Sequence, residues 1–145
     1  MRAILLATIG FLVGSLAHAE VLIEPEEAAR PNAVSPTPLV LRSISRPPEA
    51  ILTSVKAGEA VKSPFLFSVK FVAHGGAKIN DSLVRIFYLK SPSVDLKARI
   101  QQHLSNSGIT MPGAEVPPGE HRIVIELTDT NGKVGQSELV LVASP

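Results

Sequence analysis

Hydrophobic and polar residues alternate along four stretches of the chain. The stretches are 64–73, 82–90, 120–129 and 133–143. In the first stretch, Phe65, Phe67, Val69 and Phe71 fall on one side, and a more polar set falls on the other. Because successive side chains of a β-strand point to opposite faces, this period of two predicts four strands. In 82–90 both sides are fairly apolar, which indicates a central strand.

Two shorter apolar runs, 50–55 and 109–116, predict weaker strands. Pro112 lies inside the second run and has no backbone N–H to donate, so this strand is expected at a sheet edge or as an irregular segment. Between the last two alternating stretches lies Asp-Thr-Asn-Gly, residues 129–132. An Asn-Gly pair tolerates positive φ, so we expect a tight turn that closes a hairpin.

One segment has helical spacing instead. Its apolar residues recur every four positions: Leu96, Ile100 and Leu104. Asp95 precedes them as a candidate N-terminal cap, and Gly108 follows where a left-handed C-terminal cap would fall. The pattern predicts a short helix over 96–106, packed by its apolar stripe over an open end or edge of the sheets.

Frequent short strands, tight turns and alternating faces predict an all-β fold in which two antiparallel sheets form a sandwich. We expect this domain to span residues 49–145, with the one short helix inserted. The apolar side chains expected between the sheets are Phe65, Phe67, Phe71, Ile86, Ile123, Ile125, Leu127, Leu139 and Leu141.

The final hairpin carries a more specific pattern. In 117–132 a Pro-Pro-Gly turn is followed by His121, an alternating strand and Asp-Thr-Asn-Gly, and upstream Lys-Ser-Pro-Phe at 62–65 opens another alternation. These segments resemble the last hairpin and the second strand of immunoglobulin-like domains of bacterial extracellular proteins. The resemblance implies an immunoglobulin-like sandwich that lacks the cysteine pair and core tryptophan of antibody domains. It implies little about function, because this fold serves adhesion, display, spacing and accessory roles.

The first nineteen residues have the order of a secretory signal. Arg2 supplies a positive charge, residues 3–16 are mostly apolar, and Ala17-His18-Ala19 is a small-x-small cleavage pattern. The apolar run is short and interrupted by glycine, so it does not favour a membrane span. We therefore expect a signal peptide over 1–19, cleavage after Ala19, and a periplasmic or secreted protein without a membrane span. The alternative is an uncleaved N-terminal anchor.

Residues 20–48 are rich in proline and begin with several glutamates. The prolines are Pro25, Pro31, Pro36, Pro38, Pro47 and Pro48. Proline fixes φ and removes a backbone donor, so we expect an extended, polyproline-like arm that acts as a spacer. Within it, 39–44 is apolar enough to pair as an edge strand. The alternative to a linker is a proline-rich ligand for a partner.

Composition narrows the function classes. The chain has 145 residues and a formal net charge of +1, and nucleic-acid binding would need a positive footprint. There is no cysteine, which excludes disulfides, thiolate metal sites, a cysteine nucleophile and a lipid anchor on cysteine. The absence of tryptophan and the single tyrosine, Tyr88, leave few aromatic platforms. Carbohydrate binding would therefore depend on an exposed Tyr88, with Phe87 on the opposite face of its strand.

The chemistry of an enzyme is not apparent. Asp81, Asp95 and Asp129 fall in turns or at a cap, no nucleophile is paired with a base, and we expect no catalytic residue and no enzyme activity. The remaining histidines, His74, His103 and His121, have no metal-ligand spacing, so no metal or other cofactor is expected. The alternative is a small periplasmic carrier of a copper-type metal or another ligand that assembles these histidines through the fold.

Some predicted outward positions are more apolar than an isolated sandwich requires. They are Leu66, Val72, Val124, Val140 and Val142. One interpretation is a docking face for another envelope protein, or pairing at the last strand. The other is ordinary β-branched strand preference, with the residues partly covered by the helix or the arm. We thus expect an exported, non-enzymatic module for protein–protein interaction or structural spacing in the bacterial envelope, with its oligomeric state left open.

Overall fold

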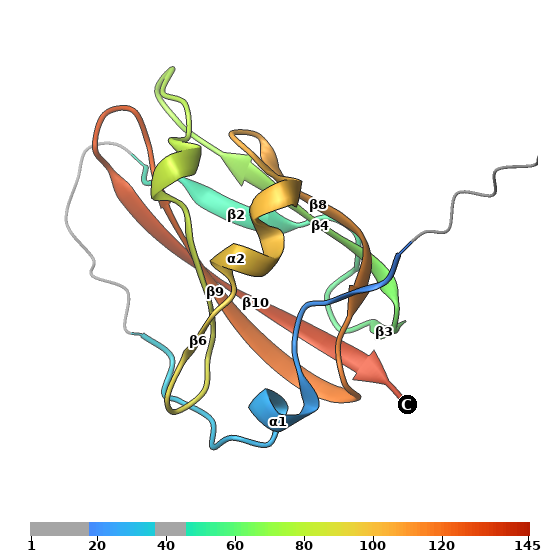
Figure 1. Ribbon diagram of the computed structural model, residues 1–145. Helices are drawn as coiled ribbons and strands as arrows, with labels where there is room; N and C mark the ends of the chain where they lie inside the picture. The colour runs from blue at the N-terminus through green and yellow to red at the C-terminus, as the bar shows by residue number, and fades with distance from the viewer. Residues whose placement is uncertain (1–17, 37–45) are drawn as a thin grey trace, which may run out of the picture.

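The computed structural model describes residues 18–36 and 46–145, which contain two β-sheets packed around one core (Figure 1). The first sheet consists of β1 (Glu20–Val21), β8 (Gly108–Glu115), β4 (Phe65–Val72) and β2 (Glu49–Leu52), with β7 (Leu104–Ser105) beside β8. The second sheet consists of β3 (Ala60–Lys62), β10 (Val134–Ser144), β9 (Gly119–Thr128), β5 (Arg85–Tyr88) and β6 (Val94–Asp95). The prediction of a β-rich, two-sheet, sandwich-like domain with a short helix is confirmed.

Both sheets are mixed, whereas the sequence predicted antiparallel sheets. β1 runs parallel to β8 and β3 runs parallel to β10, while the other pairs are antiparallel. β1 enters from the N-terminal arm, and β3 follows β2 from the opposite sheet. A two-residue hairpin forces antiparallel pairing, so strands that arrive without one can also pair in parallel.

β9 and β10 form the hairpin that the sequence predicted. Their antiparallel register continues without a break along the whole of β9. In the turn, the Gly132 amide donates to the Asp129 carbonyl at 3.0 Å, and Gly132 has a φ of 79°. The buried Asp129 carboxylate accepts from the amides of Asn131 and Lys133, each at 2.9 Å. The Asp129 residue therefore satisfies three of the amides in this turn, and the Thr130 amide donates to the Lys78 carbonyl at 2.8 Å.

The predicted core residues fill the space between the sheets, with one exception. Phe65 is only partly buried, and its ring packs edge-on against that of Phe67. The others are buried as predicted: Phe67, Phe71, Ile86, Ile123, Ile125, Leu127, Leu139 and Leu141. The core also takes Leu22 and Ile23 from the arm, which the sequence pattern did not place there.

β8 shows how a proline is accommodated inside a sheet. The Pro112 side of β8 faces β7 near Gly108 and β1 near Ala114, so the proline lies between two short neighbours. On the other side the register with β4 shifts between Phe65 and Phe67, opposite the same region. The irregular segment predicted for 109–116 is confirmed, because a missing donor is tolerated where the ladder is already interrupted.

The helix is shorter than predicted. α2 covers Lys97–Ile100 and continues as one 3₁₀ turn, Gln101–His103, before the chain enters β7. The Asp95 carboxylate accepts from the Lys97 amide at 2.8 Å, which agrees with its predicted capping role. Gly108 does not cap the helix. It opens β8 with a φ of 155°, and a Cβ at this position would lie 2.0 Å from the carbonyl oxygen of Val69.

β5 begins later than the alternating stretch 82–90 suggests. Asp81–Leu83 form a 3₁₀ turn, in which the Asn80 side-chain oxygen accepts from the amide and the hydroxyl of Ser82. Asparagine and serine favour such local bonds over a sheet ladder. The strand therefore contains only Arg85–Tyr88, with Ile86 and Tyr88 facing the core.

The described part of the arm, 20–36, packs against the domain instead of standing apart as a spacer (Figure 1). After β1, Leu22 and Ile23 are 0% and 1% exposed, and α1 (Pro25–Ala28) follows. The chain then crosses to the second sheet, where Asn32 forms a β-bridge with Lys90. The arm thus connects the β8 edge of one sheet to the end of β5 in the other.

Two sequence predictions fall on residues that the structure does not describe. They are the signal up to residue 17 and the edge strand over 39–44. His18 and Ala19, at the end of the predicted signal, are exposed. Within 18–36 and 46–145, none of the helices has the length and hydropathy needed to span a bilayer.

Candidate functional site

The predicted partner face is divided between the two sheets. Leu66 and Val72 lie on β4, whereas Val124 lies on β9 and Val140 and Val142 lie on β10. Leu66 is 46% exposed and Val140 is 48% exposed, but Val124 is only 4% exposed. Because the two sheets present separate outer faces, these five residues cannot form one continuous docking surface. The structure brings together only the three on the second sheet.

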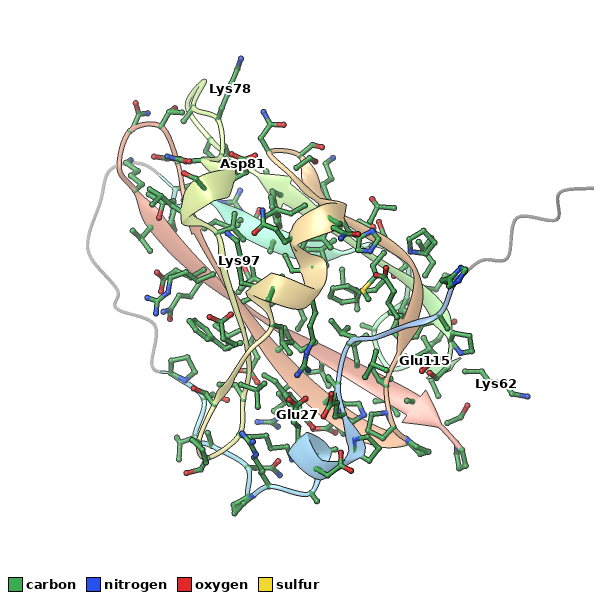
Figure 2. The ribbon with its side chains drawn as sticks, viewed as in Figure 1. Glu27, Lys62, Lys78, Asp81, Lys97 and Glu115 are labelled. Atoms are coloured by element: carbon green, nitrogen blue, oxygen red, sulfur yellow. The ribbon has the colours of Figure 1, made fainter. Side chains whose placement is uncertain are left out.

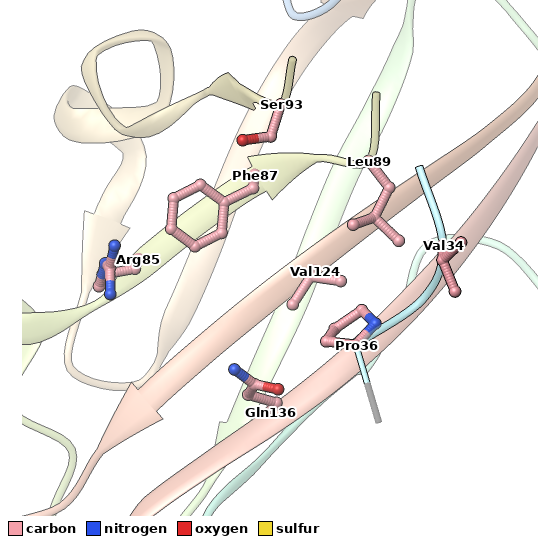
Figure 3. Close-up of a pocket in the computed structure, with 8 residues that line it drawn as sticks. All are labelled: Val34, Pro36, Arg85, Phe87, Leu89, Ser93, Val124 and Gln136. Carbon is pink, nitrogen blue, oxygen red and sulfur yellow. The ribbon is translucent and has the colours of Figure 1, made fainter. Parts of the chain in front are cut away.

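The outward side of β10, β9 and β5 contains a pocket of about 330 Å³ (Figure 3). We call this side of the second sheet the outer face. The residues that line the pocket are Val34, Pro36, Arg85, Phe87, Leu89, Ser93, Val124 and Gln136. In register, Val124 of β9 lies between Phe87 of β5 and Glu138 of β10, so its side chain is surrounded along the sheet. The pocket is therefore mainly apolar.

The charges beside the pocket are paired with one another. The Arg85 guanidinium lies 4.9 Å from the centre of the Phe87 ring, and one of its nitrogens is 3.6 Å from a carboxylate oxygen of Glu126. The Gln136 amide donates to the other oxygen of Glu126 at 3.0 Å. Arg85 remains largely exposed, so this ion pair contributes little stability. Among the described residues that line the pocket, the single charged side chain, Arg85, is thus paired, and the other lining residues are mainly apolar.

Residues 33–36 of the arm form one wall of this pocket (Figure 3). Its contacts are long: the Ala33 amide donates to the Leu89 carbonyl at 3.5 Å, and Arg122 donates to the Ser35 hydroxyl at 3.5 Å. Val34 is 93% exposed. The interpretation that the arm partly covers the outward apolar residues is supported here, because Pro36 and Val124 line the same pocket.

The base of the arm, residues 20–32, is held through a buried ion pair. Arg99 lies in α2. Both of its guanidinium NH2 groups donate to the Glu27 carboxylate of α1, at 2.7 and 2.6 Å. Arg99 also donates to the Leu22 carbonyl at 2.9 Å, and Glu27 accepts from the Glu24 amide at 3.0 Å. The hydrogen bonds from Arg99 lower the pKa of Glu27, and Glu27 in turn raises the pKa of Arg99. Paired in this way, the buried carboxylate stays charged.

Tyr88 and His121 form a second buried polar contact below the arm. The Pro117 carbonyl can only accept a hydrogen bond, so the proton of the neutral His121 ring is on Nε2, 2.6 Å from that oxygen. Nδ1 then accepts from the Tyr88 hydroxyl at 2.9 Å. Burial lowers the pKa of His121, and burial raises the pKa of Tyr88. With 1% of its surface exposed, Tyr88 cannot act as the exposed sugar platform that carbohydrate binding would require.

The three histidines considered as metal ligands have different partners. His103 donates to Glu20 at 2.6 Å, His74 lies 3.6 Å from Glu49, and His121 is enclosed with Tyr88. His74 Nε2 is buried without a hydrogen-bond partner. Across the described ranges, no three His, Asp or Glu side chains are gathered as a metal site would require.

The possible pairing at the last strand is restricted by neighbouring backbone. β3 occupies the edge of β10 at 142–144, and the Ala50 amide donates to the Ser137 hydroxyl at 2.9 Å. The Pro48 carbonyl lies so close to Gly135 that a Cβ there would be 1.9 Å from it. In the described residues this leaves 134–141 with a strand on one side alone.

Apart from Val124, the sequence analysis did not select the residues that make the pocket. Arg85 and Phe87 lie on the outward side of β5, Leu89 directly follows that strand, and Pro36 comes from the arm. The signal for β5 was present, because both sides of the stretch 82–90 are apolar and one of them must face outward. No such signal was present for the arm, because proline-rich segments have no side-chain periodicity.

Comparison with known proteins adds no identity to this geometry. No protein-family model matches the chain, and no curated protein is significantly similar to it.

Proposed function

We propose that the chain is an exported, non-enzymatic, immunoglobulin-like module that binds another envelope protein through the outer face. The observation that carries this proposal is the mainly apolar pocket on that face, formed by Phe87, Leu89 and Val124 beside charges that are already paired. Outward sheet faces are normally polar, and an apolar depression on one is typical of an interaction site.

The order of the strands supports the immunoglobulin-like part of the proposal. β2 and β3 follow one another in the chain but join different sheets, and β9 lies between β5 and β10. His121, near the start of β9, donates back to Pro117, four residues upstream. Immunoglobulin-like domains commonly place a tyrosine there, whose hydroxyl makes the equivalent bond to backbone. His121 would be the counterpart of that corner residue.

Export is supported by the N-terminal pattern and by the position of the first strand. Glu20 directly follows the predicted cleavage site and is the first residue of β1. Cleavage after Ala19 would therefore leave every strand of the described domain intact. N-terminal sequencing of the protein from an envelope fraction tests this, with Glu20 expected as the first residue.

Two charged substitutions test the docking face. In Val140→Lys and Phe87→Lys a cation is placed on the outer face, and we expect both to lose proteins that the unmodified chain captures from envelope extract. Leu66→Lys is the matched control, because Leu66 is equally exposed but lies on the other sheet. Circular dichroism and thermal unfolding verify that each variant is folded.

The pattern of loss decides the proposal. If both outer-face variants retain every partner, the outer face is not the binding site. If Leu66→Lys loses the same partners, the binding surface is not confined to the second sheet. Mass spectrometry of the captured proteins identifies the partner.

A further inference from the structure

The buried polar groups are unevenly distributed. Among the described residues, the buried charged or polar ones are Glu27, Lys90, His121 and Asp129. Asp129 caps the hairpin turn, and the other three lie where the base of the arm meets the sandwich (Figure 2 shows Glu27 there). We call this contact the arm seam. Three of these four residues therefore lie at the arm seam, and the rest of the described core is apolar apart from Asp129 in the hairpin turn.

The two sides of the seam carry opposite charges. On the arm, Glu20 and Glu27 are carboxylates that accept from His103 and Arg99, respectively. On the domain, Lys90 lies 5.3 Å from the centre of the Tyr88 ring and donates to Asn32 of the arm at 2.6 Å. At neutral pH the carboxylates offset the domain cations. When Glu27 is protonated in acid, its charge no longer offsets that of Arg99, and the domain cations remain close together.

The remaining charges around Glu27 do not reverse this balance. Arg30, on the arm itself, interacts favourably with the Glu27 carboxylate and becomes another unpaired cation in acid. Glu24 favours the charged form of Arg99 but lies on the arm and is exposed. His121 faces Lys90, so a proton gained by His121 adds a cation to the domain side. Each change in acid therefore weakens the attachment of the arm.

The sandwich has contacts that do not depend on the arm. β9 and β10 pair along ten successive positions, and β4 pairs with both β2 and β8. The arm contributes one two-residue strand, β1, together with Leu22 and Ile23. A segment with so few backbone bonds to its neighbours can open while longer ladders stay closed.

We propose that the arm is an acid-sensitive strap, held across the end of the sandwich at neutral pH and released in acid before the two sheets unfold. Residues 33–36 of the arm line the pocket of the outer face, so release of the arm also removes one wall of that pocket. The physical basis is a two-state contact whose charges are balanced in only one protonation state.

The direction of the pKa shifts agrees with this strap. Arg99 lowers the pKa of Glu27, so the pair stabilises the closed arm above the ordinary carboxyl value of 4.5, and this stabilisation is lost as pH falls through the lowered value. Burial lowers the pKa of His121 from 6.5, so the neutral buried ring also favours the closed state above that pH. Both contributions are therefore lost on the acid side.

Hydrogen exchange of the purified full chain tests the strap. Protection of each backbone segment is measured at about pH 7 and about pH 3, relative to the intrinsic exchange rate at each pH. We expect segment 20–30 to lose protection by roughly tenfold or more in acid, since an ion-paired hydrogen bond is lost, while β9 and β10 keep theirs. Equal protection of the arm at both pH values, or simultaneous loss in the arm and in β9–β10, would overturn the proposal.

One substitution separates the strap from general acid unfolding. Glu27→Gln removes the charge at nearly constant size, so the arm is expected to open at neutral pH while β9 and β10 remain protected. Glu26→Gln is the matched control, because Glu26 lies in the same helix, is exposed, and should leave the arm closed. An arm that is as protected in Glu27→Gln as in the control contradicts the proposal, and so does a variant in which all strands lose protection.

Discussion

The β9–β10 hairpin and the N-terminal arm are stabilised in different ways. In the hairpin, a ten-residue and an eleven-residue strand are joined by a turn in which the Asp129 carboxylate accepts from two amides. In the arm, β1 has two residues and α1 has four, and Glu27 is paired with a residue 72 positions away. The hairpin follows from contacts between neighbours in sequence, whereas the arm is ordered only by the domain on which it lies.

This difference indicates which segment can open without unfolding of the whole domain. Long ladders over an apolar core open only when the domain unfolds, while a segment held by few backbone bonds and a buried ion pair can open alone. The arm also contributes a wall of the pocket on the outer face, so the region with fewer backbone pairs is next to the candidate site. The hairpin supplies the rigid floor of that site through Val124.

The largest effect is expected in the hairpin. Ile125→Ala removes a fully buried side chain from the centre of β9 and should lower the free energy of unfolding by about 3–4 kcal/mol, because a cavity remains in the core. Urea denaturation followed by circular dichroism measures this. Protection should fall in both sheets at once, and a loss confined to the arm would show that the hairpin is not the stable unit.

A smaller effect is expected in the arm. Leu22→Ala also empties a fully buried position. The decrease in the free energy of unfolding should be limited to about 2 kcal/mol, because an arm that has already opened cannot be destabilised further. Hydrogen exchange should show the change in 20–30 and not in β9–β10. Val21→Ala, at an exposed position of the same strand, serves as the control. A decrease as large as that of Ile125→Ala would make the arm part of the same cooperative unit.

The smallest effect concerns pH. Because burial lowers the pKa of His121, the unfolded chain binds a proton more readily, and the free energy of unfolding should fall as the pH is lowered from about 7 to about 5. Urea denaturation at a series of pH values measures the slope. In His121→Gln the slope over this interval should be reduced. A profile that is flat in the unmodified chain would show that His121 titrates normally.

Several features could be predicted because they depend on neighbouring residues. The alternation of 64–73 and 120–129 was sufficient to assign β4 and β9, and Asn-Gly was sufficient to place the turn at 129–132. The helix was predicted too long, because Leu104 continues the apolar spacing but pairs with Ile109 as part of β7. Spacing alone cannot reveal that a residue has a strand partner nearby.

The candidate site was predicted only in part, for the same reason. The direction of Val124 was correct, since alternation determines which side of a strand faces outward. Cover by the helix or the arm was one of two interpretations, and the pattern could not decide between them, because the burial of Val124 depends on Phe87 from β5 and on a pocket completed by the arm. Leu22 and Ile23 were missed since two residues between prolines and glutamates show no period.

The sequence by itself determined the β-rich class, the inward faces of the long strands and the hairpin turn, because each depends on side-chain alternation or on the φ preference of a few adjacent residues. Only the tertiary structure decided that the sheets are mixed, that the arm belongs to the domain, and that the outer face rather than a surface shared by both sheets contains the pocket. Those features depend on contacts between segments far apart in the chain, such as Glu27 with Arg99, and no local pattern encodes which distant groups will meet.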